Sequence, residues 1–136
     1  MKPSAAGFTL LEMIVVLAIA ALIIGIGAGA ARQISEDHAL RRAAYDAEGI
    51  LMQAMTRTQA TAQTQNVALE DLSGGFQLTV RRAGTAEFVA VKNQRLLLRP
   101  GGLCEPLTLR WQRGTDWIST TLDPLTATLA DTEDNL

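Results

Sequence analysis

The chain has 136 residues, of which 48% are hydrophobic and 19% charged, and its net charge is −2. This length fits one domain, and the composition excludes a disordered or collagen-like chain. Its single histidine and single cysteine exclude an internal disulfide and a Cys/His zinc site, and the slightly acidic balance disfavours a globally basic nucleic-acid-binding protein.

The N-terminal region contains a long apolar run. No side chain between Met13 and Ala31 is charged or strongly polar. A helix over Phe8–Ala31, rising about 1.5 Å per residue, is long enough to cross a hydrocarbon core of about 30 Å. Lys2 before the run favours a cytoplasmic N-terminus, whereas Arg32 and later arginines favour the opposite orientation. Charge alone therefore leaves the orientation open.

A cleaved secretory signal peptide is a competing interpretation of the same run. Ala28-Gly29-Ala30 is typical of a cleavage site in such peptides. The apolar run is longer than most signal-peptide cores, and Glu12 stands at its beginning, where signal peptides rarely carry an acid. Both features favour a membrane helix that is retained.

Glu12 is the most informative residue of this region. Thr9-Leu10-Leu11-Glu12 matches the capping box that opens a helix. An acid at mid-membrane costs about 2.5–3.5 kcal/mol and less near the edge, so an acid in this helix suggests a function and needs a cationic partner. Cleavage after Gly7 would create an ammonium group on Phe8, four residues before Glu12 and on the same helix face. Pairing within one chain and pairing between chains both stay open.

The segment Gly7-Phe8-Thr9-Leu10-Leu11-Glu12, followed by about twenty apolar residues, resembles the leader region of type IV pilins and type II secretion pseudopilins. The resemblance implies that residues 1–7 are a leader that a prepilin peptidase removes between Gly7 and Phe8, and that the same enzyme N-methylates Phe8. It implies that residues 8–31 form a transmembrane and filament-core helix, and that Glu12 aids assembly. The protein would lie in the bacterial inner membrane as a single-pass protein, with its C-terminal domain in the periplasm.

Helical spacing continues beyond the apolar run. We expect an amphipathic periplasmic helix over residues 32–66 that frays after Ala60 and packs on a sheet through a narrow face. Glycines within the preceding apolar run are expected to allow close contact between membrane helices. The face consists of small and apolar residues spaced three or four apart: Leu40, Ala44, Ala47, Leu51, Ala54 or Met55, Thr58 and Ala62.

From Val67 onward the apolar period changes to two, which predicts a β-rich domain over residues 67–136. Strands are expected at 76–81, 87–91, 95–99, 107–112 and 117–122, with a last short strand at 127–129. Because short antiparallel strands need one covered face, the fold class is α+β, with a long N-terminal helix packed on an antiparallel sheet. The aromatic residues Phe76, Phe88, Trp111 and Trp117 are expected to be core or edge packing.

The runs at residues 95–102, 107–110 and 122–126 are similar to the minor pseudopilin H group, although Ala127-Thr128 stands where that family often has Gly-Arg. This similarity implies a minor subunit of a type II secretion pseudopilus. Its partners would be other pseudopilins, the prepilin peptidase, the inner-membrane secretion platform and the lipid bilayer. One alternative is a minor pilin of a type IV pilus that takes up DNA through its arginines. The other is a secreted domain.

Four further features are candidate sites. A Ser-His-Asp or Cys-His centre would depend on His38, which lies in a charged run typical of a solvated helix, so we expect no enzyme, no catalytic residue and no cofactor. Cys104 is expected to be an inert thiol rather than an interchain disulfide. The tail Asp131–Asn135 lacks EF-hand spacing and is expected to be a solvated terminus without metal. Nucleic-acid binding is disfavoured. The arginines are instead expected to lie on a solvent-exposed face of the sheet: Arg81, Arg82, Arg95, Arg99, Arg110 and Arg113.

Overall fold

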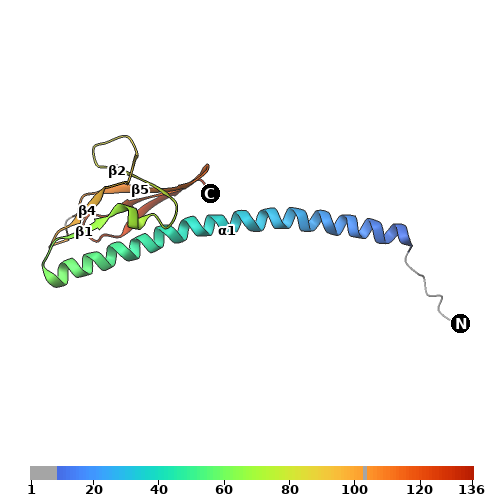
Figure 1. Cartoon of the computed structure of the whole chain (residues 1–136), viewed down its shortest axis with the longest axis horizontal. Coiled ribbons are helices and arrows are strands. Elements are labelled where there is room, and N and C mark those ends of the chain that lie inside the picture. Colours follow the sequence, from blue (N-terminus) through green and yellow to red (C-terminus); the bar gives the residue numbers. More distant parts are fainter. Residues whose placement is uncertain (1–8, 103) are drawn as a thin grey trace. The chain divides into compact units, whose positions relative to one another are not determined.

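The computed structural model describes residues 9–102 and 104–136, and within this part it describes only the backbone of residues 28–35. The chain divides into two compact units, Met1–Glu36 and Asp37–Leu136. The helix α1 (Leu10–Thr61) contributes to both, and all strands belong to the second (Figure 1). The predicted α+β fold, with an N-terminal helix followed by an antiparallel sheet domain, is confirmed.

A five-stranded antiparallel sheet forms most of the second unit. Its order is β3 (Val89–Ala90), β2 (Gln77–Arg82), β5 (Leu107–Arg113), β6 (Asp116–Leu122) and β7 (Leu129–Asp134). A separate two-stranded antiparallel sheet pairs β1 (Gln65–Ala68) with β4 (Arg95–Leu98). The 3-10 helix η1 (Leu69–Leu72) follows β1 directly.

The second half of α1 covers one face of the sheet, as the spacing predicts. Its small residues are buried, which allows the backbone of the helix to lie close to the strands. Alternate residues of β2, β5 and β6 complete the core from the sheet side. The buried helix positions are Leu40, Ala43, Ala44, Ala47, Leu51, Met55 and Thr58, whereas Ala54 is partly buried and Ala62 is exposed.

The end of α1 has a local cause. Ala62 has φ 54°, which is the left-handed conformation that often ends a helix, and α1 stops at Thr61. The chain then enters β1 within a few residues. Fraying is expected here from the sequence, and neither β1 nor η1 is predicted by it. Within β1 only Val67 gives a clear apolar signal, because the strand also contains the polar residues Gln65 and Asn66.

The last strand lies elsewhere than predicted. Residues 127–129 were expected to form it, but Ala127 is buried in a turn with φ 57°, and β7 occupies Leu129–Asp134. The acidic tail is therefore not simply a solvated terminus. Its side chains are mostly exposed while its backbone pairs with β6, and such an edge strand lacks the apolar alternation that reveals a covered strand. The strand expected at 87–91 is shortened to Val89–Ala90.

Candidate functional site

The N-terminus of α1 is capped as its sequence predicts. The Thr9 Oγ1 atom accepts a hydrogen bond from the backbone N–H of Glu12 at 3.3 Å, and the Thr9 carbonyl accepts the N–H of Met13 at 3.2 Å. A threonine in this role satisfies a helix N–H that has no intrahelical acceptor. The Thr9 half of the capping box is thus formed, and it fixes where the helix begins relative to Glu12.

Glu12 lies in the first turn of α1 with an exposed side chain. Within residues 9–102 and 104–136, no ion pair or side-chain hydrogen bond engages its carboxylate. The position at the N-terminal end of the helix is itself favourable for a negative charge, since backbone N–H groups point toward it. Glu12 therefore presents a carboxylate at the rim of an apolar helix, available to a cation outside the described chain.

Gly7 and Phe8, where the sequence predicts cleavage and methylation, lie outside the described residues. The ammonium group that processing would place on Phe8 is a prediction from sequence. Thr9, the next residue, is described, and it already acts as the helix cap.

The segment Leu10–Gly27 is exposed along its whole length. Its mean hydropathy is 2.7, and none of it is buried against the rest of the described chain. Leu10 and Ile26 near its ends are 80% and 76% exposed. By length and composition this segment is able to cross a membrane once. An apolar surface of this extent needs lipid or other protein helices around it, because exposure to water is unfavourable.

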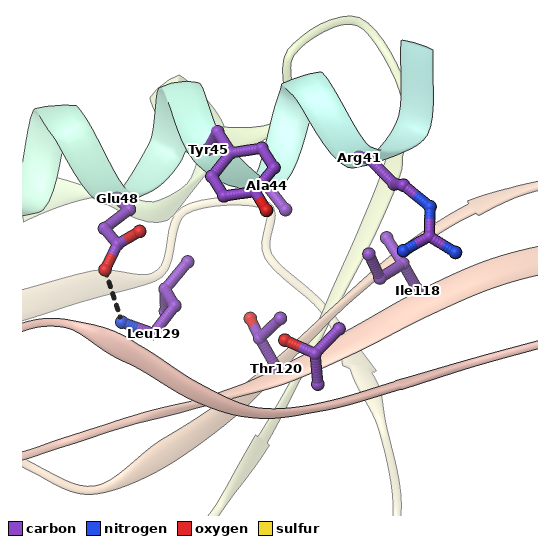
Figure 2. A pocket seen from close by; sticks show the side chains of 8 residues that line it. Arg41, Ala44, Tyr45, Glu48, Ile118, Thr120 and Leu129 are labelled. Atoms are coloured by element: carbon purple, nitrogen blue, oxygen red, sulfur yellow. Dashed lines mark hydrogen bonds between the residues drawn. The ribbon is translucent and has the colours of Figure 1, made fainter. Parts of the chain in front are cut away.

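In the second unit, a small pocket lies between α1 and the strands β6 and β7 (Figure 2). The carboxylate of Glu48 accepts the backbone N–H of Leu129 at 3.1 Å, and the guanidinium of Arg41 pairs with Asp134 at 2.8 Å. These two contacts hold both ends of β7 to the helix. Arg41 and Glu48 are not among the residues of the predicted small and apolar helix face, and both contact the edge strand β7.

The same pocket contains a buried hydroxyl group. Thr120 is 3% exposed, and its Oγ1 atom has no hydrogen-bond partner in the described part of the chain. The register of β6 with β7 shifts between Ser119 and Thr121, and Asp131 on β7 has φ 50°. The pocket volume of about 60 Å³ is large enough for a water molecule beside this hydroxyl.

Two of the six arginines, Arg81 and Arg110, contact aromatic rings. Arg81 and Arg110 lie on the sheet face opposite α1, where Phe88 and Trp117 hold the Arg110 guanidinium at 3.9 and 4.5 Å from their ring centres. Arg81 approaches the same Phe88 ring at 4.9 Å. Such stacks of cations on aromatic rings are favourable. Phe88 and Trp117 are therefore packing residues of this outer face, while Trp111 is fully buried in the core.

Cys104 is half-buried beside the turn at residues 123–125. Its thiol donates to the Pro124 carbonyl at 3.4 Å. Burial raises the pKa of the Cys104 thiol, and the nearby negative charge of Asp123 raises it further. Because the thiolate is the reactive form, this environment is that of an inert thiol, as expected. His38 is exposed, also as expected.

Comparison with known proteins finds one similarity. A family model described as the prokaryotic N-terminal methylation motif matches residues 2–30. The match supports kinship with the type IV pilin-like and pseudopilin proteins, which are structural subunits rather than enzymes. It agrees with the single apolar N-terminal helix. No curated protein and no solved structure matches the chain.

Proposed function

We propose that this protein is a minor pseudopilin of a type II secretion system that assembles through its N-terminal helix into a periplasmic filament. The observation that carries the proposal is the methylation motif at residues 2–30, which coincides with an exposed apolar helix that bears one acid near its start. In this proposal the prepilin peptidase removes residues 1–7 and methylates Phe8. The inner membrane then holds residues 8–31 until assembly.

The physical basis of assembly is burial of the Leu10–Gly27 surface. Before assembly, lipid covers this segment, and in a filament the equivalent helices of neighbouring subunits would cover it. Small residues such as Gly25 and Gly27 would allow close approach of neighbouring helices, because they carry no side chain. The packing of the described chain itself does not require glycine there, since a Cβ atom added at either position would meet no neighbour within 4 Å. The Glu12 carboxylate would bind the methylated ammonium of Phe8, in its own chain or in the next.

The secretion role rests on the resemblance of the strand region to the minor pseudopilin H group. The other pseudopilins and the inner-membrane secretion platform are the proposed partners, and the filament would support export of folded proteins. The DNA-uptake pilus alternative needs a continuous basic surface. The net charge of −2 and the engagement of the Arg81 and Arg110 guanidinium groups with aromatic rings of the chain itself disfavour it.

Mass spectrometry of the mature protein, extracted from native membranes, tests the processing step. We expect a chain that begins at methylated Phe8, and we expect the unprocessed chain in a strain that lacks prepilin peptidase. A chain that begins at Ala31 would show removal of a signal peptide, and an unprocessed chain in the wild type would equally contradict the proposal.

Deletion of the gene tests the choice of machine. We expect loss of secreted proteins from the culture medium, with surface pili and DNA uptake unchanged. Complementation with the wild-type gene is the control. Normal secretion together with loss of pili or DNA uptake would contradict the secretion role and assign the protein to a type IV pilus.

A further inference from the structure

The strand β4 has one open edge. Within the described chain it pairs only with β1. Two hydrogen bonds distinguish the two edges of β4. On the edge that faces β1, the Leu69 N–H donates to the Gln94 carbonyl. On the open edge, the Arg82 guanidinium donates to the Arg95 carbonyl at 3.4 Å. Because backbone groups alternate along an antiparallel strand, the N–H and C=O of Leu97 face the same side as those of Arg95, away from β1.

A groove of about 360 Å³ lies at this edge. It is lined by Arg82, Arg95, Leu97, Arg99, Cys104 and Glu105. Glu105 is already paired with Arg82. Arg95 and Arg99 are exposed, and neither forms an ion pair with another described residue. Besides the Arg82–Glu105 pair, the groove thus carries two guanidinium groups that no described carboxylate neutralises, in a protein whose net charge is negative.

The side chains along β4 follow a two-residue period. Leu96 and Leu98 are buried in the core, so Arg95, Leu97 and Arg99 point to the other face. Leu97 is 49% exposed between the two arginines. Cross-strand neighbours interact directly. A strand added beside Arg95, Leu97 and Arg99 would therefore match them best with a carboxylate, an apolar side chain and a second carboxylate at alternate positions.

We propose that the β4 edge and its groove bind an extended acidic segment of another protein by strand addition. Backbone hydrogen bonds to Leu97 would supply affinity, and the arginines on either side would select carboxylates at the matching spacing. A nucleic acid would satisfy the arginines but has no backbone N–H and C=O ladder to pair with Leu97. The site involves only the second unit, and it does not depend on the role proposed for the N-terminal helix.

Peptide binding to the full-length protein in detergent micelles tests this proposal. The probe is the fluorescein-labelled peptide TETVTET, which places valine between two glutamates at alternate positions. Fluorescence anisotropy should show saturable binding that weakens as salt rises, because charge attraction contributes. The lysine peptide TKTVTKT and a scrambled peptide with adjacent glutamates should bind at least about tenfold more weakly.

Charge reversal separates specific binding from general attraction. Combined Arg95→Glu and Arg99→Glu changes should weaken binding of TETVTET at least about tenfold and create binding of TKTVTKT. Arg57→Glu is the matched control, since Arg57 is an exposed arginine on α1, and it should leave the binding of both peptides unchanged. Circular dichroism checks that each variant is folded.

Two changes test the backbone ladder. Leu97→Pro removes an N–H on the open side of β4, where the β1 ladder does not need it, and should abolish peptide binding. A TETVTET peptide N-methylated at valine should also bind the wild-type protein more weakly, which keeps the test informative if the proline variant fails to fold.

The proposal is overturned if TETVTET does not bind, if charge reversal leaves its binding unchanged, or if the N-methylated peptide binds as well as the unmodified one. Absence of binding would assign the arginines to protection of an exposed strand edge. Binding of oligothymidine without binding of the peptide would assign the groove to nucleic acid instead.

Discussion

The indole N–H of Trp111 donates a hydrogen bond of 2.8 Å to the backbone carbonyl of Leu72, and both residues are buried. Leu72 ends the 3-10 helix η1, so its carbonyl lies where helical hydrogen bonding stops. The bond therefore satisfies two buried polar groups at once. It ties the centre of the sheet at β5 to the segment between β1 and β2.

Replacement of Trp111 with phenylalanine should destabilise the second unit. The change leaves the Leu72 carbonyl without its buried donor and removes ring volume from the core, so we expect a loss of about 2–4 kcal/mol in the free energy of unfolding. Urea denaturation of the full-length protein in detergent, followed by circular dichroism, measures it. Tyr45→Phe, at a residue 72% exposed, is the control and should change stability by less than about 0.5 kcal/mol. Equal effects of the two changes would refute this account of Trp111.

Attachment of the edge strand β7 should depend on the two helix residues that contact it. Glu48→Ala removes the acceptor of the Leu129 N–H, and Arg41→Met removes the ion pair with Asp134. Since the ion pair is partly exposed, its loss should cost no more than about 1 kcal/mol. Hydrogen exchange in β7 should nevertheless accelerate in both variants, most clearly in Glu48→Ala, because local opening is favoured. Arg42→Met, at the adjacent exposed arginine, is the control, and acceleration of the same size there would argue against the two contacts.

Gly102 and Gly101 form a matched pair for a test of the turn after β4. Gly102 has φ +77°, and a Cβ atom there would lie 2.8 Å from the Leu125 carbonyl oxygen, whereas Gly101 has φ +97° and open space around it. Gly101→Ala should cost roughly 1 kcal/mol for the unfavourable backbone conformation alone. Gly102→Ala should cost clearly more, because the backbone at residue 125 must also move. Thermal unfolding of both variants measures the difference, and equal melting temperatures would show that the close approach is absent.

Alkylation of Cys104 should be slow at neutral pH. Burial, together with the Asp123 charge, raises the pKa of the thiol, so the neutral form dominates and the reactive thiolate accumulates only at higher pH. The rate of iodoacetamide labelling should therefore rise with pH beyond the range where an ordinary thiol has levelled off. Asp123→Asn removes one cause of the raised pKa and should shift this profile to lower pH. A profile that matches free cysteine, or one that Asp123→Asn leaves in place, would contradict the assignment.

Glu12 should be needed for assembly and not for membrane insertion. Glu12→Gln keeps the size of the side chain and removes its charge, and Glu12→Ala removes both. We expect both variants in the membrane fraction, with loss of co-purification with partner subunits, because the ammonium group proposed on Phe8 would lose its counterion. Asp46→Asn, at an exposed acid of the second unit, is the control and should co-purify normally. Normal co-purification of Glu12→Gln would show that the negative charge is dispensable.

The local parts of the fold were predictable from sequence. The Thr9 cap, the apolar span and the buried face of α1 depend on residues a few positions apart, and helical spacing exposes such patterns directly. Covered strands such as β2 and β5 were also predicted, since burial of one face imposes alternation. The edge strands β1 and β7 were missed or misplaced because partner strands and helix contacts, rather than apolar residues, hold them.

The sequence by itself determined an apolar helix with one acid at its start, a small-residue helix face and the presence of a β-rich domain. Only the tertiary structure decided where each arginine lies and which side chains it contacts. Arg110 lies between Phe88 and Trp117, while Arg95 and Arg99 lie at the open edge of β4. The reason is physical, because apolar periodicity and composition depend only on residues that are close together along the chain. The pairing register of the strands, by contrast, brings together residues that sequence spacing leaves unrelated.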